Sequence, residues 1–258
     1  YFTTDIPDSR KKDCSLGIIS RYAWGLDYHE VIKQKLEDLH SFIEFVFRSN
    51  IKAKICVDTV PILEREFANR AGIGWIGKNC NLINREYGSY IFLAELIIDK
   101  DLIYDDIEIK ERCGTCTRCI DACPTGALLS PRTLDSRKCI SYLTLEYKGI
   151  IPREFRKAIG NRIFGCDICQ EVCPWNRNTK PTKEKDFFPR KMRTTPNLQD
   201  LMLLSDNEFR NLFKNSPIKR IKRQRFLRNV AIAIGNSSEP LFISTLIEAL
   251  KDNEPLVR

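Results

Sequence analysis

Two closely spaced cysteine runs constrain this chain more than any other feature, because their spacing is that of iron–sulfur cluster ligands. The first run reads C-x2-C-x2-C-x3-C-P and consists of Cys113, Cys116, Cys119 and Cys123, followed by Pro124. The second run reads C-x2-C-x3-C-P and consists of Cys166, Cys169 and Cys173, followed by Pro174. The first spacing is that of bacterial two-cluster ferredoxins, in which the fourth cysteine ligates the other cluster.

The second run is one cysteine short of this pattern, and Cys139, which lies between the two runs, is the obvious substitute. We therefore predict two [4Fe–4S] clusters whose ligands interleave along the chain. The predicted ligands of cluster 1 are Cys113, Cys116, Cys119 and Cys173, and those of cluster 2 are Cys123, Cys139, Cys166 and Cys169. Because clusters held in this way transfer single electrons, the sequence predicts a redox protein.

Zinc and disulfides are the alternatives for these cysteines. Structural zinc sites use four ligands with longer gaps between the pairs, so the spacing disfavours zinc. An odd count of eleven cysteines with many close pairs disfavours disulfides and favours metal ligands in a reducing, cytoplasmic compartment. Outside the pattern, Cys14, Cys56 and Cys80 are each expected to be small buried apolar side chains.

Composition is that of a soluble globular protein, with 43% hydrophobic and 29% charged residues among 258. No run approaches the roughly 20 apolar residues of a membrane span, so we expect no membrane association. The formal charge is +8, and two bound clusters would lower it to about +4. The excess is therefore less informative than its distribution, since residues 219–228 contain six cations and no acid. The chain begins at Tyr1 rather than Met, so we expect it to be a fragment.

Hydrophobic periodicity predicts a mixed α/β arrangement in the first hundred residues. It predicts a helix over residues 31–47, a strand over 51–57 and a helix over 62–70. A glycine-rich loop is expected over residues 72–77. Residues 82–83 and 90–98 are predicted to be strands that pair across a turn at 86–88.

The remainder divides into three predicted regions. Residues 112–176 form the cluster module, 177–200 are rich in Lys, Arg, Thr and Pro and are expected to be a linker, and 201–258 are helical. The predicted helices at 220–234 and 241–250, joined by a turn at 235–238, resemble one HEAT-type repeat, and a further helix is expected to begin at residue 256. Since one repeat cannot bury both of its faces, we expect more chain to follow.

Two motifs in the N-terminal half carry possible chemistry. Residues 72–77 match G-x-G-x-x-G, but a predicted helix precedes them and a strand follows, which disfavours dinucleotide binding. Asp58 follows the strand at 51–57 and would serve as a general acid if an apolar pocket raised its pKa. Its alternative role is to cap the next helix, with Thr59 as a competing cap. His29, one of two histidines, could be a base, a hydrogen-bonding partner or neither.

Together these motifs resemble the epoxyqueuosine reductase family, the cobalamin-dependent enzymes of the last step of queuosine synthesis in tRNA. The resemblance covers nearly the whole chain in order. Its most specific part is N-terminal, and its ferredoxin-like part is shared with many proteins. The matching segments are residues 21–29, Val57-Asp58-Thr59 with Pro61 and Leu63-Glu64-Arg65, residues 72–79, 113–128, 139–144, 160–162 and 165–176. The chain departs from the expected pattern at Val60, Cys80 and Ala94, where Gly, Thr and Gly are expected.

The resemblance implies an α+β fold with an N-terminal α/β cobalamin-binding domain over residues 1–111, followed by a ferredoxin-like two-cluster module and a HEAT-like tRNA-binding region. It implies a cobalamin without a protein histidine ligand, and Asp58 as the donor of a proton to the epoxide oxygen. The residues implied to bind cobalamin are Arg21, Asp58, Lys78, Asn79, Leu82, Ser141 and Asp167, and those implied to bind tRNA are Arg220, Arg223 and Arg228.

The implied partners are tRNA carrying epoxyqueuosine and an external low-potential electron donor of the flavodoxin or ferredoxin type, with the enzyme acting as a cytoplasmic monomer. Two alternatives remain at this stage. Another cobalamin and two-cluster reductase, such as a reductive dehalogenase, would share the cluster module but lack a basic helical tail. A non-enzymatic electron carrier would bind no cobalamin. For the cations of residues 219–228 the alternative to RNA binding is a solvated helix face.

Overall fold

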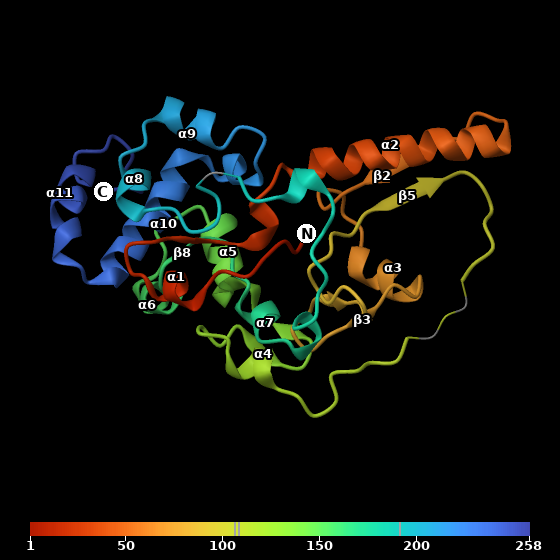
Figure 1. Cartoon of the computed structure of the whole chain (residues 1–258), viewed down its shortest axis with the longest axis horizontal. Helices are drawn as coiled ribbons and strands as arrows, with labels where there is room; N and C mark the ends of the chain where they lie inside the picture. Colours follow the sequence, from red (N-terminus) through yellow and green to blue (C-terminus); the bar gives the residue numbers. More distant parts are fainter. Residues whose placement is uncertain (106, 108, 191) are drawn as a thin grey trace.

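The fold was determined as a computed structural model, which describes residues 1–105, 107, 109–190 and 192–258 (Figure 1). It is a mixed α+β structure in which each sheet of the described residues has two strands. The N-terminal part contains α1 (Asp8–Lys12), β1 (Ile18–Ile19), a 3-10 helix (Arg21–Ala23), α2 (Tyr28–Phe47), β2 (Ala53–Cys56), α3 (Glu64–Arg70), β3 (Trp75–Ile76), β4 (Leu82–Ile83) and β5 (Glu95–Ile98).

The long helix α2 confirms the helix predicted over residues 31–47 and begins three residues earlier. Asp27 caps it, because the Asp27 carboxylate accepts a hydrogen bond from the His29 backbone N–H. The helix ends at Arg48, whose φ of 49° is left-handed. In Figure 1 it extends along the top of the molecule, with β2 beneath it. Its first turn carries Tyr28 and His29, which line the large cavity described below.

The pairing predicted between residues 82–83 and 90–98 is wrong. Strand β4 instead forms an antiparallel hairpin with β3, and β5 pairs antiparallel with β2. The hairpin depends on the glycine run, because a Cβ on Gly74 would lie 2.3 Å from the carbonyl oxygen of Ile83. Residues 72–77 are thus partly strand, and their glycines permit close backbone packing. Strands β2 to β5 form two antiparallel pairs rather than the sheet of a typical α/β domain.

The cluster segment consists of short elements. They are α4 (Arg118–Asp121), β6 (Leu128–Ser130), β7 (Thr133–Leu134), a 3-10 helix (Ser136–Lys138), α5 (Ile140–Leu145), α6 (Arg153–Ile159), β8 (Arg162–Phe164), α7 (Ile168–Glu171) and a 3-10 helix (Pro174–Asn176). Strand β8 pairs parallel with β1, joining this segment to the N-terminal part, while β6 and β7 form an antiparallel hairpin. Helices α4 and α7 contact each other, and each carries one cysteine of a run, Cys119 in α4 and Cys169 in α7.

The C-terminal part is helical, as predicted. It contains a 3-10 helix (Lys185–Phe187), α8 (Leu198–Met202), α9 (Asp206–Leu212), a 3-10 helix (Pro217–Ile221), α10 (Lys222–Ser237), a 3-10 helix (Pro240–Phe242) and α11 (Ile243–Ala249). Helix α10 continues through the turn expected at 235–238 and ends at Ser238, whose φ is 56°. Residues 256–258 form no helix, so the helix expected there is not present. The HEAT-type repeat stays a prediction.

The segment expected to be a linker packs against the N-terminal part. The backbone N–H groups of Gly17 and Ile19 donate to the carbonyls of Pro196 and Thr194. Arg193 is buried, and its guanidinium donates to the carbonyls of Gly25 and Lys214. These backbone and side-chain hydrogen bonds fix the segment in place.

One hydrophobic core is shared by segments that are distant in sequence. It contains Trp24 from the N-terminal part, Phe164 from β8, Leu198 from the segment expected to be a linker, and Phe213 and Phe226 from the C-terminal helices, all buried. Strong burial of large side chains is the main stabilising contribution in such a core. The domain boundaries predicted from the sequence stay a prediction, and this core connects all four regions that they separate.

Candidate functional site

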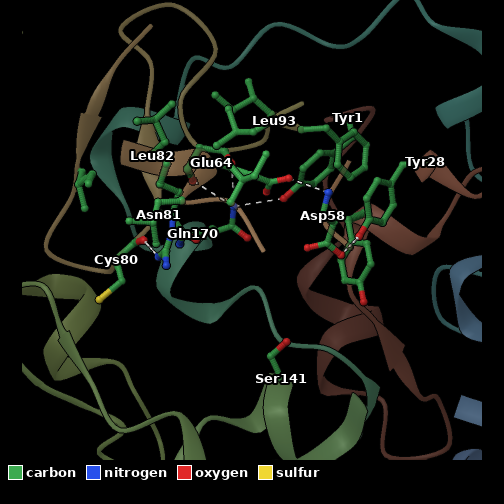
Figure 2. A pocket seen from close by; sticks show the side chains of 18 of the residues that line it. Tyr1, Tyr28, Asp58, Glu64, Cys80, Asn81, Leu82, Leu93, Ser141 and Gln170 are labelled. Carbon is green, nitrogen blue, oxygen red and sulfur yellow. Dashed lines mark hydrogen bonds between the residues drawn. The ribbon is translucent and has the colours of Figure 1, made fainter. Parts of the chain in front are cut away.

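A cavity of about 1170 Å³ lies between the N-terminal part and the cluster segment (Figure 2). It is larger than the roughly 300–1,000 Å³ of ordinary ligand pockets. Its lining combines the start of α2, the segment from Asp58 to α3, the tip of the β3–β4 hairpin, residues 89–93, and side chains from α5 and α7. The lining residues that matter below are Tyr28, His29, Asp58, Cys80, Leu82, Ser141, Gln170 and Arg220.

Asp58 lies at the edge of this cavity, two residues after β2 ends. Its φ of 53° is unusual for a residue with a side chain. The Tyr28 hydroxyl donates to Asp58 Oδ2 at 2.6 Å, and the Asp58 backbone N–H donates to Glu64 Oε1 at 2.6 Å. Helix α3 begins only at Glu64 and has no side-chain cap, so the capping role considered for Asp58 and Thr59 is wrong. About half of the Asp58 side chain (48%) is exposed.

His29 is placed between two carboxylates. Its Nδ1 lies 2.7 Å from Asp27 Oδ1, and its Nε2 lies 3.4 Å from Asp58 Oδ2. Within the part of the chain that the structure describes, Nε2 is buried and has no well-formed hydrogen bond. The Asp58 contact is therefore a close charge–charge contact.

These neighbours shift the pKa values in opposite directions. The interaction with His29, with a further contribution from the Tyr28 hydroxyl, lowers the pKa of Asp58 to about 2 although partial burial opposes it. Hydrogen bonding to Asp27 and the interaction with Asp58 raise the pKa of His29 to about 9. The expectation that an apolar pocket raises the pKa of Asp58 is thus wrong, because a cation and a hydroxyl donor face the carboxylate.

A second cavity, of about 230 Å³, is lined by the four cysteines predicted for cluster 1, Cys113, Cys116, Cys119 and Cys173. Lys78 closes one side, since its Nζ donates to the carbonyls of Gly114 at 2.5 Å and Cys116 at 3.0 Å. Trp75 and Trp175 pack edge to face beside it, with ring centroids 4.9 Å apart. The donor set and the enclosed space fit a [4Fe–4S] cluster, which needs one thiolate per iron.

Three of the cysteines predicted for cluster 2 lie close to one another. Burial, and next the charges of Cys166 and Cys139, raise the pKa of Cys169 well above its usual value, which indicates that the three thiols are neighbours. Cys123 Sγ accepts a hydrogen bond from the Ala127 N–H at 3.3 Å. No three His, Cys, Asp or Glu side chains of the described residues converge as ligands of a single metal ion.

The three remaining cysteines differ in their surroundings. Cys56 is buried, as expected. Cys14 is exposed and Cys80 is partly exposed in the large cavity, so the expectation of burial is wrong for both. Cys80 lies in the left-handed region with a φ of 65°, at the turn of the β3–β4 hairpin.

Of the residues implied to bind cobalamin, the structure places Asp58, Leu82 and Ser141 on the wall of the large cavity. The other four are absent from its lining and make internal contacts. Arg21 is buried between Asp5 and Glu171, and Asp167 is buried with its carboxylate accepting from Ser20 and the Arg21 N–H. Lys78 contacts the cluster 1 loop, and the Asn79 amide donates to the Cys169 carbonyl at 3.3 Å.

Sequence reasoning missed several lining residues. Tyr1, Glu64 and Gln170 all reach the cavity, as Figure 2 shows. Gln170 adjoins the predicted ligand Cys169, so this adjacency was a usable signal. Tyr1 and Glu64 carried none, because only the tertiary arrangement brings them to the cavity.

The three arginines implied to bind tRNA have different surroundings. Arg220 is 42% exposed, lines the cavity and forms an ion pair with Glu146. Arg223 forms an ion pair with Asp252 at 2.5 Å. Arg228 is 3% exposed, and its guanidinium donates to the carbonyls of Leu143, Tyr147 and Gly149. The prediction of a phosphate contact is therefore wrong for Arg228, because its guanidinium donates to backbone carbonyls inside the protein. The Arg223 guanidinium is paired with the Asp252 carboxylate.

The paired cysteine sites beside a large cavity define the class as a two-cluster iron–sulfur protein. Residues 112–176 match the family profile described as "4Fe-4S double cluster binding domain", and residues 1–59 match "Epoxyqueuosine reductase QueG, DUF1730". No helix of the described residues is long and apolar enough to cross a membrane.

Known proteins narrow this class. The chain is 46% identical to epoxyqueuosine reductase of Salmonella typhimurium over 96% of its length and 64% of the relative's, and 45% identical to that of Escherichia coli over 96% and 65%. A crystal structure of an epoxyqueuosine reductase with an epoxyqueuosine-modified tRNA-Tyr stem loop matches with a TM-score of 0.92 at 37% identity, over 100% of this chain and 68% of that one.

A structure of the Bacillus subtilis enzyme with its catalytic aspartate loop swung out of the active site matches with a TM-score of 0.90 at 36% identity, over 100% of this chain and 68% of that one. The chain belongs to the epoxyqueuosine reductase family. It spans slightly less than two thirds of the length of the first two curated relatives.

Proposed function

We propose that the protein containing this chain reduces epoxyqueuosine to queuosine at the wobble position of tRNA, with cobalamin in the large cavity and two [4Fe–4S] clusters as the source of electrons. The observation that carries the proposal is the wall of the cavity. It holds Asp58 together with Ser141 and Gln170, which are close in sequence to the predicted ligands Cys139 and Cys169. The relatives described above support the same reaction.

The residues present fit a large cofactor. The cavity exceeds ordinary pockets in volume and combines apolar side chains such as Leu82 and Leu93 with polar ones such as Ser141. Cobalamin, when bound and reduced, supplies a strongly nucleophilic cobalt for attack on a carbon of the epoxide. The chain's own contribution is to enclose and orient the cofactor and to supply a proton. Of the residues on the cavity wall, we assign Asp58, Leu82 and Ser141 to contacts with the bound cobalamin.

The proposed cluster ligands are the two interleaved sets. The first set, Cys113, Cys116, Cys119 and Cys173, is supported by the cavity that these four side chains line. The second set, Cys123, Cys139, Cys166 and Cys169, is supported by the proximity of Cys139 to Cys166 and Cys169, whose pKa values are raised by burial first and also by the charge of Cys139. Clusters bound there supply single electrons at low potential.

Asp58 is the proposed proton donor. Opening an epoxide produces an alkoxide, which needs a proton before water can leave and the alkene can form. Oδ2 of Asp58 faces Tyr28 and His29, whereas Oδ1 has no hydrogen-bond partner among the described residues. Oδ1 is therefore the atom that we assign to the substrate oxygen.

Three exposed cations at the start of the basic run are proposed to meet tRNA phosphate, namely Lys219, Arg220 and Lys222. Arg220 lines the cavity itself, so it is suited to guide a polyanionic substrate to this site. An electron carrier of the flavodoxin or ferredoxin type is the proposed external donor, and the enzyme is proposed to act as a cytoplasmic monomer.

The decisive experiment is single-turnover conversion of epoxyqueuosine-tRNA by the full-length enzyme carrying Asp58→Asn. The substitution keeps the size of the side chain but leaves a group that cannot take up a proton and pass it on. We expect a fall in rate of about 10²-fold or more, which is the usual scale of general acid catalysis. Iron content and cobalamin uptake should remain normal.

Asp101→Asn is the matched control, because Asp101 is exposed and lies outside the cavity lining. It should convert at the wild-type rate. Near-normal conversion by Asp58→Asn would remove Asp58 from the mechanism.

A further inference from the structure

The first turn of α2 holds His29 in one orientation. Asp27 is the N-cap, and its Oδ1 accepts hydrogen bonds from both the His29 backbone N–H at 3.2 Å and the ring Nδ1 at 2.7 Å. A single carboxylate oxygen thus fixes the backbone and the imidazole together. The Tyr28 ring stacks on the imidazole, with centroids 4.1 Å apart. The opposite nitrogen, Nε2, is directed to Asp58 Oδ2.

This arrangement requires a proton between His29 and Asp58. Because Nδ1 donates to Asp27, a neutral imidazole would present a lone pair on Nε2. That lone pair would then lie 3.4 Å from a carboxylate oxygen, and two acceptors without a proton repel each other. The contact is favourable only if Nε2 or Oδ2 carries a proton. One proton therefore belongs to the pair.

Neighbouring groups decide where this proton resides. Asp27 faces the ring from the start of α2, and Asp58 and Glu64 face it from the segment after β2. Tyr28 donates to Asp58, and the more distant Arg220 charge also lowers the pKa of Asp58. Two carboxylates beside the ring favour the imidazolium, in agreement with the raised pKa of His29. At neutral pH the proton rests on Nε2.

We propose that His29, held by Asp27, supplies the proton that Asp58 delivers to the epoxide oxygen. The inference rests on the proposed function. The Nε2–H bond of the imidazolium breaks and its proton passes to Asp58 Oδ2. The carboxyl group, turning about its Cβ–Cγ bond, brings that same proton to the position of Oδ1 and gives it to the alkoxide, so that an O–H bond forms and the carboxylate is restored. The products are a neutral imidazole, a carboxylate and an alcohol, so charge and protons balance. The His29 side chain is 21% exposed, and the imidazole regains its proton from solvent. Asp27 is a positioning residue that acts through His29.

The proposal predicts a specific change in the pH–rate profile. In the wild type, single-turnover conversion should fall as the pH rises through about 9, because His29 loses its proton there. Asp27→Asn in the full-length enzyme keeps a capping oxygen and removes the charge beside Nδ1. We expect this fall in rate, the alkaline limb of the profile, to occur about one pH unit lower, because the pKa of His29 decreases when the opposite charge of Asp27 is lost. The rate at pH 6 should stay within about threefold of the wild type, because His29 is still protonated there.

Two further variants distinguish this proposal from a purely structural role of Asp27. Asp27→Ser retains an N-capping oxygen without a charge and should move the limb in the same direction. His29→Gln should lower the rate at pH 7.5 at least about tenfold and recover part of it at acid pH, where solvent protonates Asp58 directly. A merely structural role for Asp27 would lower the rate equally at all pH values.

An NMR titration of the imidazole provides a readout that does not depend on turnover. The His29 signal, assigned by its absence in His29→Gln and recorded with oxidised clusters, should titrate near pH 9 in the wild type and lower in Asp27→Asn. His40, whose Nε2 lies 2.8 Å from the Ile51 carbonyl, is the internal control and should not change between the variants.

The outcomes separate this inference from the proposed function. Wild-type conversion with an alkaline limb that does not move in Asp27→Asn or Asp27→Ser rejects the proton supply and leaves the proposed function intact. A His29 pKa at or below its ordinary 6.5 also rejects the proton supply. Failure of the wild type to convert epoxyqueuosine-tRNA rejects the proposed function, and the proton supply with it.

Discussion

At the scale of single residues, the basic run from Lys219 to Arg228 contains two kinds of cation. Arg228 is buried and donates hydrogen bonds to three backbone carbonyls of the cluster segment, whereas Arg220 is exposed to solvent at the cavity. A periodic run of charges on a helix does not reveal this division, because the neighbours of Arg228 lie about eighty residues earlier in the chain. Their roles should therefore separate in experiment.

Arg228→Met should destabilise the protein by about 3 kcal/mol, because it leaves the carbonyls of Leu143, Tyr147 and Gly149 without their donor. Denaturant unfolding measures this change. Arg220→Ala should alter stability by about 0.5 kcal/mol or less and should instead weaken tRNA binding and reduce its salt dependence by about one unit of slope. Equal losses of stability in the two variants would contradict the division.

A residue's role could be predicted from the sequence where its cause lies in nearby residues of the chain. The four cysteines around the smaller cavity were predictable, because a covalent cluster demands fixed ligand spacing. The charge state of Asp58 was not predictable. It is set by Tyr28 and His29, which lie about thirty residues earlier and meet it only in the folded chain.

At the scale of elements, the β3–β4 hairpin is the piece that forms one wall of the cavity. Gly74→Ala should destabilise it, because the added methyl would overlap the Ile83 carbonyl and neither backbone can move freely. We expect a loss of about 2 kcal/mol in the free energy of unfolding, together with weaker cobalamin binding.

Gly235→Ala is the matched control for that substitution. Gly235 lies within α10, and a Cβ there would meet no atom within 4 Å. It should leave cobalamin binding unchanged and should stabilise α10 slightly, since alanine is the better helix former. Normal stability of Gly74→Ala would show that the hairpin adjusts.

Replacing Cys139 tests whether the two sets of cluster ligands, which lie on different elements, bind two separate clusters. It immediately precedes α5, while the first set is carried by α4, its preceding loop and the second residue after α7. Cys139→Ala should reduce iron by about half, from about eight to about four atoms per chain, and leave one cluster detectable by electron paramagnetic resonance. Cys14→Ala, at an exposed cysteine, is its control. Complete loss of iron in Cys139→Ala with normal folding would contradict two separate sets.

Strand partners were harder to predict than the elements themselves. Helix α2 was predictable from its periodicity, whereas the partner of residues 82–83 was assigned by proximity along the chain. The correct partner, β3, is favoured by the small size of two glycines: Gly74 lets the two backbones approach closely, and Gly77 leaves room for the Ile83 side chain. A local sequence pattern does not show which of several short strands will meet.

At the scale of the whole molecule, the regions that the sequence separates contribute to one core. The parallel pairing of β1 with β8 and the burial of Trp24 with Phe213 and Phe226 join the beginning, middle and end of the chain. The order of motifs along the sequence was informative about chemistry. It was not informative about packing, because the packing partners are far apart in sequence.

The position of Ser141 and Gln170 has a consequence for the order in which the proposed reductase acquires its cofactors. Both cavity side chains are within two residues of a proposed cluster ligand, Cys139 or Cys169. A chain that has not yet received iron carries free thiols at those positions, where burial and neighbouring thiolates disfavour ionisation of Cys169. We therefore expect iron–sulfur insertion to come before cobalamin uptake during biogenesis, so that cells starved of iron would accumulate enzyme that their vitamin supply cannot activate.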